Sequence, residues 1–235
     1  MNSDSGNLVG RAFFVSGIDT GVGKTVATGL MARYLISSGV DAITVKMVQT
    51  GCEGFSEDLE AHRRMCGIGR LPEDESGLTA PEIFRFPSSP SLAARLENRK
   101  IDLKRIASSV EECRRRRDVV LVEGAGGLLV PLSDDTLSAD FAAAQGWPLI
   151  LVTCGRLGSV NHTLLSLEAA KSRGMSVAGV VYDWCGDADP DIDADTEREI
   201  RRRLADMGFK PALVRVPRVE EGATLPDVDF SEIFA

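Results

Sequence analysis

One stretch of the sequence has the residue types and spacing of a phosphate-binding loop. It reads GIDTGVGKT from Gly17 to Thr25 and lies between an apolar run and a helical pattern. Glycines let backbone N–H groups close around phosphate oxygens, the helix adds its positive N-terminus, and Lys24 adds a point charge. The hydroxyl of Thr25 can hold Mg²⁺. Because five residues instead of four separate Gly17 from Gly23, we expect a variant of this loop.

Other segments carry side chains that suit phosphate chemistry. Lys46 closes an apolar run, and Thr50 follows four positions later, so both can face the phosphates. Glu123 closes a second apolar run and precedes a turn made of glycine and alanine. A carboxylate at that place suits an Mg²⁺ ligand or a water-orienting group, while small residues let the backbone approach a substrate. A predicted helix start offers Asp58 as a further oxygen ligand.

The overall composition argues against several classes of function. The chain has 235 residues, 43% hydrophobic and 26% charged, with a formal net charge of −8 and a pI near 4.9. Nucleic-acid binding needs an excess of Lys and Arg, so we expect no nucleic-acid partner. The two histidines lie far apart, which leaves little material for a histidine metal centre or triad. The one dense basic run, residues 114–117, is expected to be a solvated helix end.

Cysteine usage and hydropathy indicate the compartment. The five cysteines form no C-x-x-C pair and no metal-finger spacing, which is typical of reduced thiols in the cytoplasm. No segment approaches the ~20 continuous apolar residues that cross a bilayer, and no apolar signal region stands at the start. We therefore expect a cytoplasmic protein that has no membrane partner.

Short apolar runs alternate with longer amphipathic stretches along the chain. This alternation predicts an α/β fold of the P-loop NTPase-like type, a mostly parallel sheet with helices on both faces. The expected strands are residues 12–16, 43–48, 119–122, 149–152, 177–181 and 213–216. The expected crossover helices are residues 24–36, 103–115, 160–171 and 196–207. We expect residues 1–235 to form a single domain, with residues 71–90 as a long loop over the site.

In order and wording, these segments resemble the dethiobiotin synthetase family of biotin-pathway ligases. The resemblance also covers PSLAAR from Pro90 and GRLGSVNHTLL from Gly155, and it spans residues 11 to about 220. It implies an ATP- and CO₂-dependent conversion of 7,8-diaminononanoate to dethiobiotin, through an N-carbamate that is phosphorylated and then attacked by the second amine. A carbamate and a triphosphate repel each other, so this chemistry needs lysines and a divalent cation to neutralise their approach.

The resemblance also implies roles for individual residues. The implied catalytic residues are Lys46, Lys24 and Thr20, and the implied Mg²⁺ ligands are Thr25, Asp58 and Glu123. The implied substrate contacts are Thr20, Lys46, Thr50, Gly126, Gly127 and Asn161. The implied nucleotide contacts are Gly21, Val22, Gly23, Lys24, Thr25, Val26, Asp58, Glu123, Gly124, Ala125, Gly126, Asp183, Trp184, Pro217, Arg218 and Val219. The family is homodimeric with substrate lying across the subunit interface, so Asn161 would contact substrate bound mainly by the neighbouring chain.

Two positions depart from the family pattern. Met47 follows the lysine where the family usually has proline, which alters the geometry of the strand end. Asp183 stands where many members use asparagine to recognise adenine. Adenine needs a donor and an acceptor, whereas an ionised aspartate only accepts hydrogen bonds. We therefore expect relaxed base selectivity: either Asp183 pairs with donors of guanine or cytosine, or adenine is held by backbone and stacking near residues 217–219 while Asp183 caps a turn.

Two other functions share part of this pattern. A P-loop amide-forming ligase that uses glutamine usually carries an appended glutaminase domain, and fewer than twenty residues follow Val216. A switch ATPase of the partitioning type carries an additional lysine early in the loop, where this chain has Ile18, Asp19 and Thr20. A dethiobiotin synthetase is therefore the function that the sequence favours.

Overall fold

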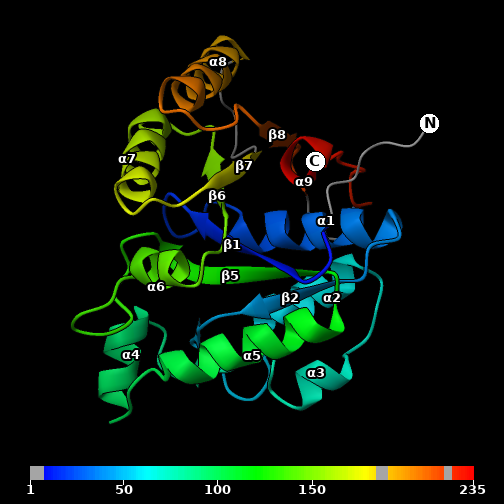
Figure 1. Ribbon diagram of the computed structural model, residues 1–235, viewed down its shortest axis with the longest axis vertical. Coiled ribbons are helices and arrows are strands. Elements are labelled where there is room, and N and C mark those ends of the chain that lie inside the picture. Colours follow the sequence, from blue (N-terminus) through cyan, green and yellow to red (C-terminus); the bar gives the residue numbers. More distant parts are fainter. Residues whose placement is uncertain (1–7, 184–189, 220–223) are drawn as a thin grey trace.

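The computed structural model describes residues 8–183, 190–219 and 224–235, and a six-stranded sheet forms its centre (Figure 1). The strands, in spatial order, are β2 (Ala42–Lys46), β5 (Val119–Gly127), β1 (Arg11–Gly17), β6 (Leu149–Cys154), β7 (Val177–Asp183) and β8 (Leu213–Val216). Every neighbouring pair in this sheet runs parallel. The carboxyl ends of the strands therefore share one edge, which is where α/β sheets bind ligands.

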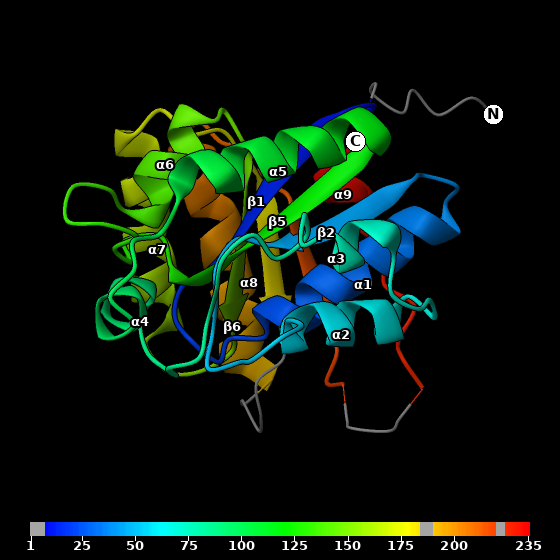
Figure 2. The same ribbon diagram turned by 90° about the horizontal axis from the view of Figure 1, so that it is seen from below.

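Helices cover both faces of this sheet, as the view in Figure 2 shows for α5 on one side and α1 on the other. The first face is covered by α5 (Leu103–Arg116), α6 (Ser138–Ala144), α7 (Ser159–Ser172) and α8 (Pro190–Asp206). The second face is covered by α1 (Lys24–Ser37) and α9 (Ser231–Phe234). Successive residues of β1 serve the two cores, because Phe14 packs on the first face and Phe13 on the second. Strands buried on both faces explain why the sequence shows near-continuous apolar runs there.

The predicted strand at residues 43–48 ends earlier than expected. β2 stops at Lys46, and the chain then leaves the main sheet to form β3 (Gln49–Thr50). β3 pairs with β4 (Ile83–Phe84) in a separate two-stranded sheet. The backbone N–H of Met47 still donates to the carbonyl of Glu123 at 2.9 Å, which anchors the point of departure.

The segment of residues 71–90 was predicted to be one long loop, and in the structure short regular elements interrupt it. It contains α3 (Pro72–Glu75) and β4, and it ends at α4 (Pro90–Leu96). Proline suits the first turn of α3, and the Asp74 carboxylate accepts from the N–H of Leu71 at 2.8 Å, which caps the helix. Arg63 from α2 (Glu57–Met65) then pairs with Asp74 at 2.7 Å and fixes the segment to the body of the protein.

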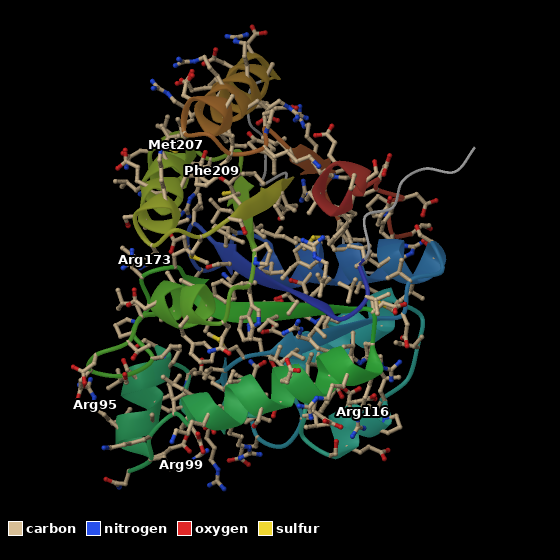
Figure 3. All side chains as sticks on the ribbon, viewed as in Figure 1. Arg95, Arg99, Arg116, Arg173, Met207 and Phe209 are labelled. Atoms are coloured by element: carbon tan, nitrogen blue, oxygen red, sulfur yellow. The ribbon has the colours of Figure 1, made fainter. Side chains whose placement is uncertain are left out.

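The helix predicted at residues 196–207 starts earlier than expected: α8 begins at Pro190. Proline is favoured in a first helical turn, and the acidic Asp191 and Asp193 there complement the helix dipole. Met207 and Phe209, just beyond α8, pack against the first core (Figure 3).

The basic run at residues 114–117 ends α5 as expected, but it is only partly solvated. Arg114 donates to the carbonyl of Gly10 at 2.6 Å, and Arg117 pairs with Glu73 at 2.8 Å. Arg116, labelled at one end of α5 in Figure 3, is more exposed and pairs with a glutamate one turn earlier. The run therefore ties the helix end to neighbouring segments.

The thiols of Cys52, Cys66, Cys113 and Cys154 are free, and Cys185 lies outside the described residues. Within the part of the chain that the structure describes, no helix combines the length and the apolar character needed to cross a membrane.

Candidate active site

A cavity of about 660 Å³ opens beside the carboxyl ends of β1, β2 and β5, at the start of α1. Its wall is formed by the phosphate-binding loop, by the strand ends and the residues that follow them, by Asp58 and by the segment that leads into α4. The cavity thus lies where the sheet topology predicts a ligand.

The loop between β1 and α1 has the conformation of a phosphate cradle. Gly23 caps α1 with a φ of 84°, and Gly21 has a φ of 73°, left-handed values that favour glycine. A Cβ on Gly17 would lie 2.6 Å from Cγ2 of Val22 and 2.9 Å from the carbonyl oxygen of Asp19, so the loop can close over this position only because it has no side chain. Nζ of Lys24 donates to the carbonyl of Asp19 at 2.9 Å. The ammonium is therefore held within the loop.

A cluster of charges from β2, α2 and β5 faces this loop. Nζ of Lys46 lies 2.6 Å from Oδ2 of Asp58 and 2.7 Å from Oε1 of Glu123. The hydroxyl oxygen of Thr25 lies within hydrogen-bond distance of the same two carboxylates, 3.0 Å from Oδ1 of Asp58 and 3.3 Å from Oε1 of Glu123, and its single proton can be donated to either. The strand register brings Lys46 and Glu123 opposite each other. One ammonium and one hydroxyl thus join two carboxylates at the mouth of the loop.

Burial and charge act in opposite directions on these groups. Burial would raise the pKa of Glu123, but the charge of Lys46 and the contact with His62 outweigh it and hold that pKa well below the usual range. Burial would lower the pKa of Lys46, but Glu123 and Asp58 raise it above its usual value. Burial lowers the pKa of Lys24, and the nearby charge of Lys46 adds to that effect. Glu123 and Lys46 are therefore both charged at neutral pH.

The oxygen atoms of Thr25, Asp58 and Glu123 fit a hard divalent cation such as Mg²⁺. This ion prefers oxygen ligands and is usually bound through one or two carboxylates together with substrate phosphates. Over residues 8–183, 190–219 and 224–235, no group of three or more His, Cys, Asp and Glu side chains could hold a metal ion by itself. Two carboxylates and a hydroxyl beside a phosphate cradle thus suit a cation that binds together with a nucleotide.

His62 belongs to this cluster, although the sequence analysis gave it no role. Its Nε2 lies 3.1 Å from Oε2 of Glu123, and both side chains are fully buried. His62 follows Asp58 by four residues on α2, so the two side chains share one face of that helix. That spacing is the signal in the sequence that could have identified it.

Known proteins are similar to this chain in sequence over most of its length. A sequence profile described as an AAA domain matches residues 11–221. The ATP-dependent dethiobiotin synthetase of Chlorobaculum tepidum is 49% identical over 207 residues, which covers 88% of this chain and 87% of the relative. A second ATP-dependent dethiobiotin synthetase, from Haemophilus influenzae, is 50% identical over 174 residues, which covers 74% of this chain and 91% of the relative. The chain belongs to the dethiobiotin synthetase family.

Solved structures of more distant proteins share the fold of this family member. A ParA-family ATPase from Chlorobium tepidum aligns with a TM-score of 0.52 at 18% identity, covering 90% of this chain and 86% of that chain. The pNOB8 ParA protein, solved bound to nonspecific DNA, aligns with a TM-score of 0.55 at 13% identity, covering 92% and 89%. At such low identity the likeness concerns the fold alone, and it confirms the predicted α/β architecture of the P-loop NTPase type.

Most residues to which the dethiobiotin synthetase pattern gives a role come together in the cavity wall. These are Thr20, Gly21, Gly23, Lys24, Thr25, Val26, Lys46, Thr50, Asp58, Glu123, Ala125 and Gly126. Val22 and Gly124 lie behind the wall: Val22 is fully buried, and a Cβ on Gly124 would lie 2.9 Å from the ring of Phe14. Gly127 lines a neighbouring pocket instead, next to Ile18 and Asp19.

Three wall residues, Val48, Gln49 and Val130, were given no role by the sequence. Residues 87–90 also line the wall, and they belong to the segment that was expected as a loop over the site. Gln49 accepts a hydrogen bond from the Ser56 hydroxyl at 2.5 Å, so the N-cap of α2 helps to place it. No local motif marks these positions, because they reach the cavity through the small β3–β4 sheet and the turn before α4.

The residues predicted to contact the base lie at the ends of β7 and β8. Asp183 closes β7 beside the phosphate-binding loop, and a side chain on Gly23 would overlap its carboxylate. Pro217 and Arg218 are exposed just beyond β8 and line a separate pocket, and Val219 follows them half-buried. Trp184 lies outside the described residues.

Asn161, the predicted contact to a neighbouring chain's substrate, is not part of the cavity wall. It is exposed on the first turn of α7. Other residues of α7, including Leu165, line the pocket that also contains Gly127 and Leu129. Asn161 therefore does not line the cavity that contains Thr20, Lys46 and Thr50.

Proposed function

We propose that this chain uses Mg²⁺ and a nucleoside triphosphate to close the ring of dethiobiotin. The substrates are 7,8-diaminononanoate, CO₂ and the nucleotide, and the products are dethiobiotin, a nucleoside diphosphate and phosphate. The observation that carries the proposal is the convergence of two lysines and two carboxylates at the phosphate-binding loop. Family membership supports the same reaction, since its relatives are named ATP-dependent dethiobiotin synthetases.

The reaction brings anions together in a confined site. One amine of the substrate adds to CO₂ and loses a proton, which gives a carbamate. A carbamate oxygen attacks the γ-phosphorus and displaces the nucleoside diphosphate, and the second amine then attacks the carbonyl and releases phosphate. Carbamate and triphosphate repel each other, so positive charge must sit between them.

Lys24 and Lys46 supply that charge from fixed positions. Lys24 is held inside the loop by the carbonyl of Asp19, at the place where phosphate oxygens would lie. Lys46 is held by Asp58 and Glu123, so it is positioned before substrate arrives and costs little reorganisation during reaction. A magnesium ion held by Thr25, Asp58 and Glu123 would add positive charge beside the phosphates. Thr20 and Thr50, both in the cavity wall, offer hydroxyls for the carbamate or amine.

The enzyme assay is direct. Purified protein is incubated with diaminononanoate, bicarbonate, Mg²⁺ and nucleotide, and dethiobiotin is measured. We expect product with the wild type and a loss of about 100-fold or more in kcat with Lys46→Ala, because a preorganised charge at the reacting group is removed.

The exposed Lys100→Ala is the matched control, since it removes an equal charge away from the cavity. No product with any nucleotide would contradict the function. Product formation with full activity of Lys46→Ala would contradict only the role of that lysine.

The assembly we propose is a homodimer in which Asn161 reaches substrate bound in the partner's cavity. Large apolar side chains are exposed around this part of the chain, including Leu129, Leu157 and Leu165, at 53%, 96% and 56%. Burying them against a second copy would remove that surface from water. Mixing the inactive variants Lys46→Ala and Asn161→Ala tests this, because a mixed dimer regains one intact site. No recovery of activity on mixing would contradict a shared site.

A further inference from the structure

Glu123 has two carboxylate oxygens, and they face different partners. Oε1 contacts Nζ of Lys46 at 2.7 Å and the hydroxyl of Thr25 at 3.3 Å. Oε2 lies 3.1 Å from Nε2 of His62, and neither atom makes a hydrogen bond of good geometry to any group among the described residues. Buried polar atoms normally have a partner, and at 3.1 Å these two are close enough to serve each other.

The proton on His62 is placed by a chain of hydrogen bonds that begins at an arginine. The guanidinium of Arg63 can only donate, and its Nη1 donates to the hydroxyl oxygen of Thr44 at 2.7 Å. The proton of that hydroxyl is then free to point at Nδ1 of His62, 3.1 Å away. We assign His62 the tautomer in which Nδ1 accepts this proton, which puts the ring's own proton on Nε2, the nitrogen nearest Glu123.

The side chain of Arg63, where this series of hydrogen bonds begins, is itself held in place. Arg63 makes a two-pronged pair with Asp74, through Nε at 2.9 Å and Nη2 at 2.7 Å. Asp74 also accepts from the hydroxyl of Thr79 at 2.7 Å. None of Thr44, His62, Arg63, Asp74 and Thr79 lines the cavity, so none of them is placed to contact a substrate there.

We propose that His62 is a positioning residue: its Nε2–H holds Oε2 of Glu123 so that Oε1 faces Thr25 and the divalent cation that binds there with the nucleotide. A carboxylate at the end of a side chain can rotate, and a hydrogen bond to the oxygen away from the metal removes that freedom. Only His62 can restrain Oε2 in this way among these three residues, because Lys46 and Thr25 both contact Oε1. This inference rests on the proposed function, since that function requires the cation.

Two substitutions separate the two nitrogens of the ring. In His62→Gln, the side-chain amide N–H₂ replaces Nε2 and can still donate to Glu123, whereas the contact at Nδ1 is lost. In His62→Asn, the shorter amide replaces Nδ1 and keeps the Thr44 contact, whereas the donor to Glu123 is lost. Both remove the ring, so both carry a similar packing cost, and the free energy of unfolding of each is measured alongside.

The readout is the dissociation constant of Mn²⁺ in the presence of a non-hydrolysable ATP analogue, measured by electron paramagnetic resonance on the full chain. We expect His62→Asn to weaken Mn²⁺ binding by about 10- to 100-fold, the usual cost of losing such a partner of a metal ligand. We expect His62→Gln to recover most of the affinity. Thr163→Val on α7 is the control. It also removes a buried polar group, a hydroxyl that contacts the hydroxyl of Thr153 and the carbonyl of Ser159, but on a different helix from His62.

Other outcomes would overturn the inference. Wild-type Mn²⁺ affinity in His62→Asn would mean that the histidine only fills space, and equal weakening in both variants would mean that the Nε2–H is not what matters. If His62→Asn does not fold, Thr44→Val takes its place, since it keeps the ring but removes the hydroxyl that sets the proton; unchanged Mn²⁺ binding there would overturn the inference as well. Mn²⁺ binding without dethiobiotin formation in the wild type would contradict the proposed function and leave this inference standing.

Discussion

The region around Lys46 and the region around Asp183 differ in how deeply their side chains are buried. Lys46 and Glu123 are buried, at 5% and 0% exposure, and each contacts several groups from other elements. At the ends of β7 and β8, Asp183 is half-buried and Pro217 is exposed. The difference teaches where change is tolerated: buried charges depend on one another's positions, whereas side chains at the more open ends of β7 and β8 can change without leaving a buried charge unpaired.

The largest effect should come from breaking the buried ion pair in the first region. Glu123→Gln keeps the shape but leaves Lys46 with Asp58 as its only carboxylate partner among the described residues. We expect a loss in kcat of about 100-fold or more. The free energy of unfolding should fall by about 1–3 kcal/mol, because the buried ammonium of Lys46 loses one of its two carboxylate partners.

A double variant tests the reason for that loss. Glu123→Gln combined with Lys46→Met removes both charges, so thermal unfolding should return toward the wild type while activity stays lost. A double variant no more stable than Glu123→Gln would contradict the account of the stability loss.

A smaller effect should come from the point where the two regions meet. Gly23→Ala forces a side chain onto a left-handed backbone and into the carboxylate of Asp183, whereas Gly21→Ala has similar backbone strain and no neighbour within 4 Å. The strain itself costs roughly 1–2 kcal/mol in either variant. We expect Gly23→Ala to weaken nucleotide binding more than Gly21→Ala, as measured by calorimetry.

The added variant Asp183→Ala separates strain from collision. It should restore part of the nucleotide affinity in the Gly23→Ala background and change little in the Gly21→Ala background. Equal losses of nucleotide affinity in the two glycine variants would mean that the Asp183 side chain moves aside at no cost. The contact between Gly23 and Asp183 would then not link the two regions.

The smallest effect on rate, and the sharpest on selectivity, should come from the second region. An aspartate only accepts hydrogen bonds, whereas an asparagine offers adenine both a donor and an acceptor. We expect Asp183→Asn to raise the preference for ATP over GTP and CTP by about tenfold in kcat/KM while kcat with ATP stays close to the wild-type value. A wild type that already uses ATP strictly would contradict the role given to Asp183.

The phosphate-binding loop could be predicted in detail because its requirements are local. Positive φ at Gly21 and Gly23, and the absence of a side chain at Gly17, are needs of a few consecutive residues, and glycine meets them. The strands of the main sheet could also be predicted from the sequence, since burial on both faces leaves continuous apolar runs. The segments that the sequence described less well, residues 47–50 and 71–90, owe their structure to the β3–β4 pairing and to the Arg63–Asp74 ion pair.

By itself, the sequence determined the α/β fold, the phosphate-binding loop around Lys24 and the family to which the chain belongs. Only the tertiary structure decided that Lys46 meets Glu123, 77 positions away, because that meeting depends on β2 and β5 being neighbours in register. It also decided that a lone histidine lies behind Glu123 and that Asp183 lies against Gly23. The physical reason is that conformational preferences act between neighbours along the chain, whereas the charges and hydrogen bonds of the site act through space.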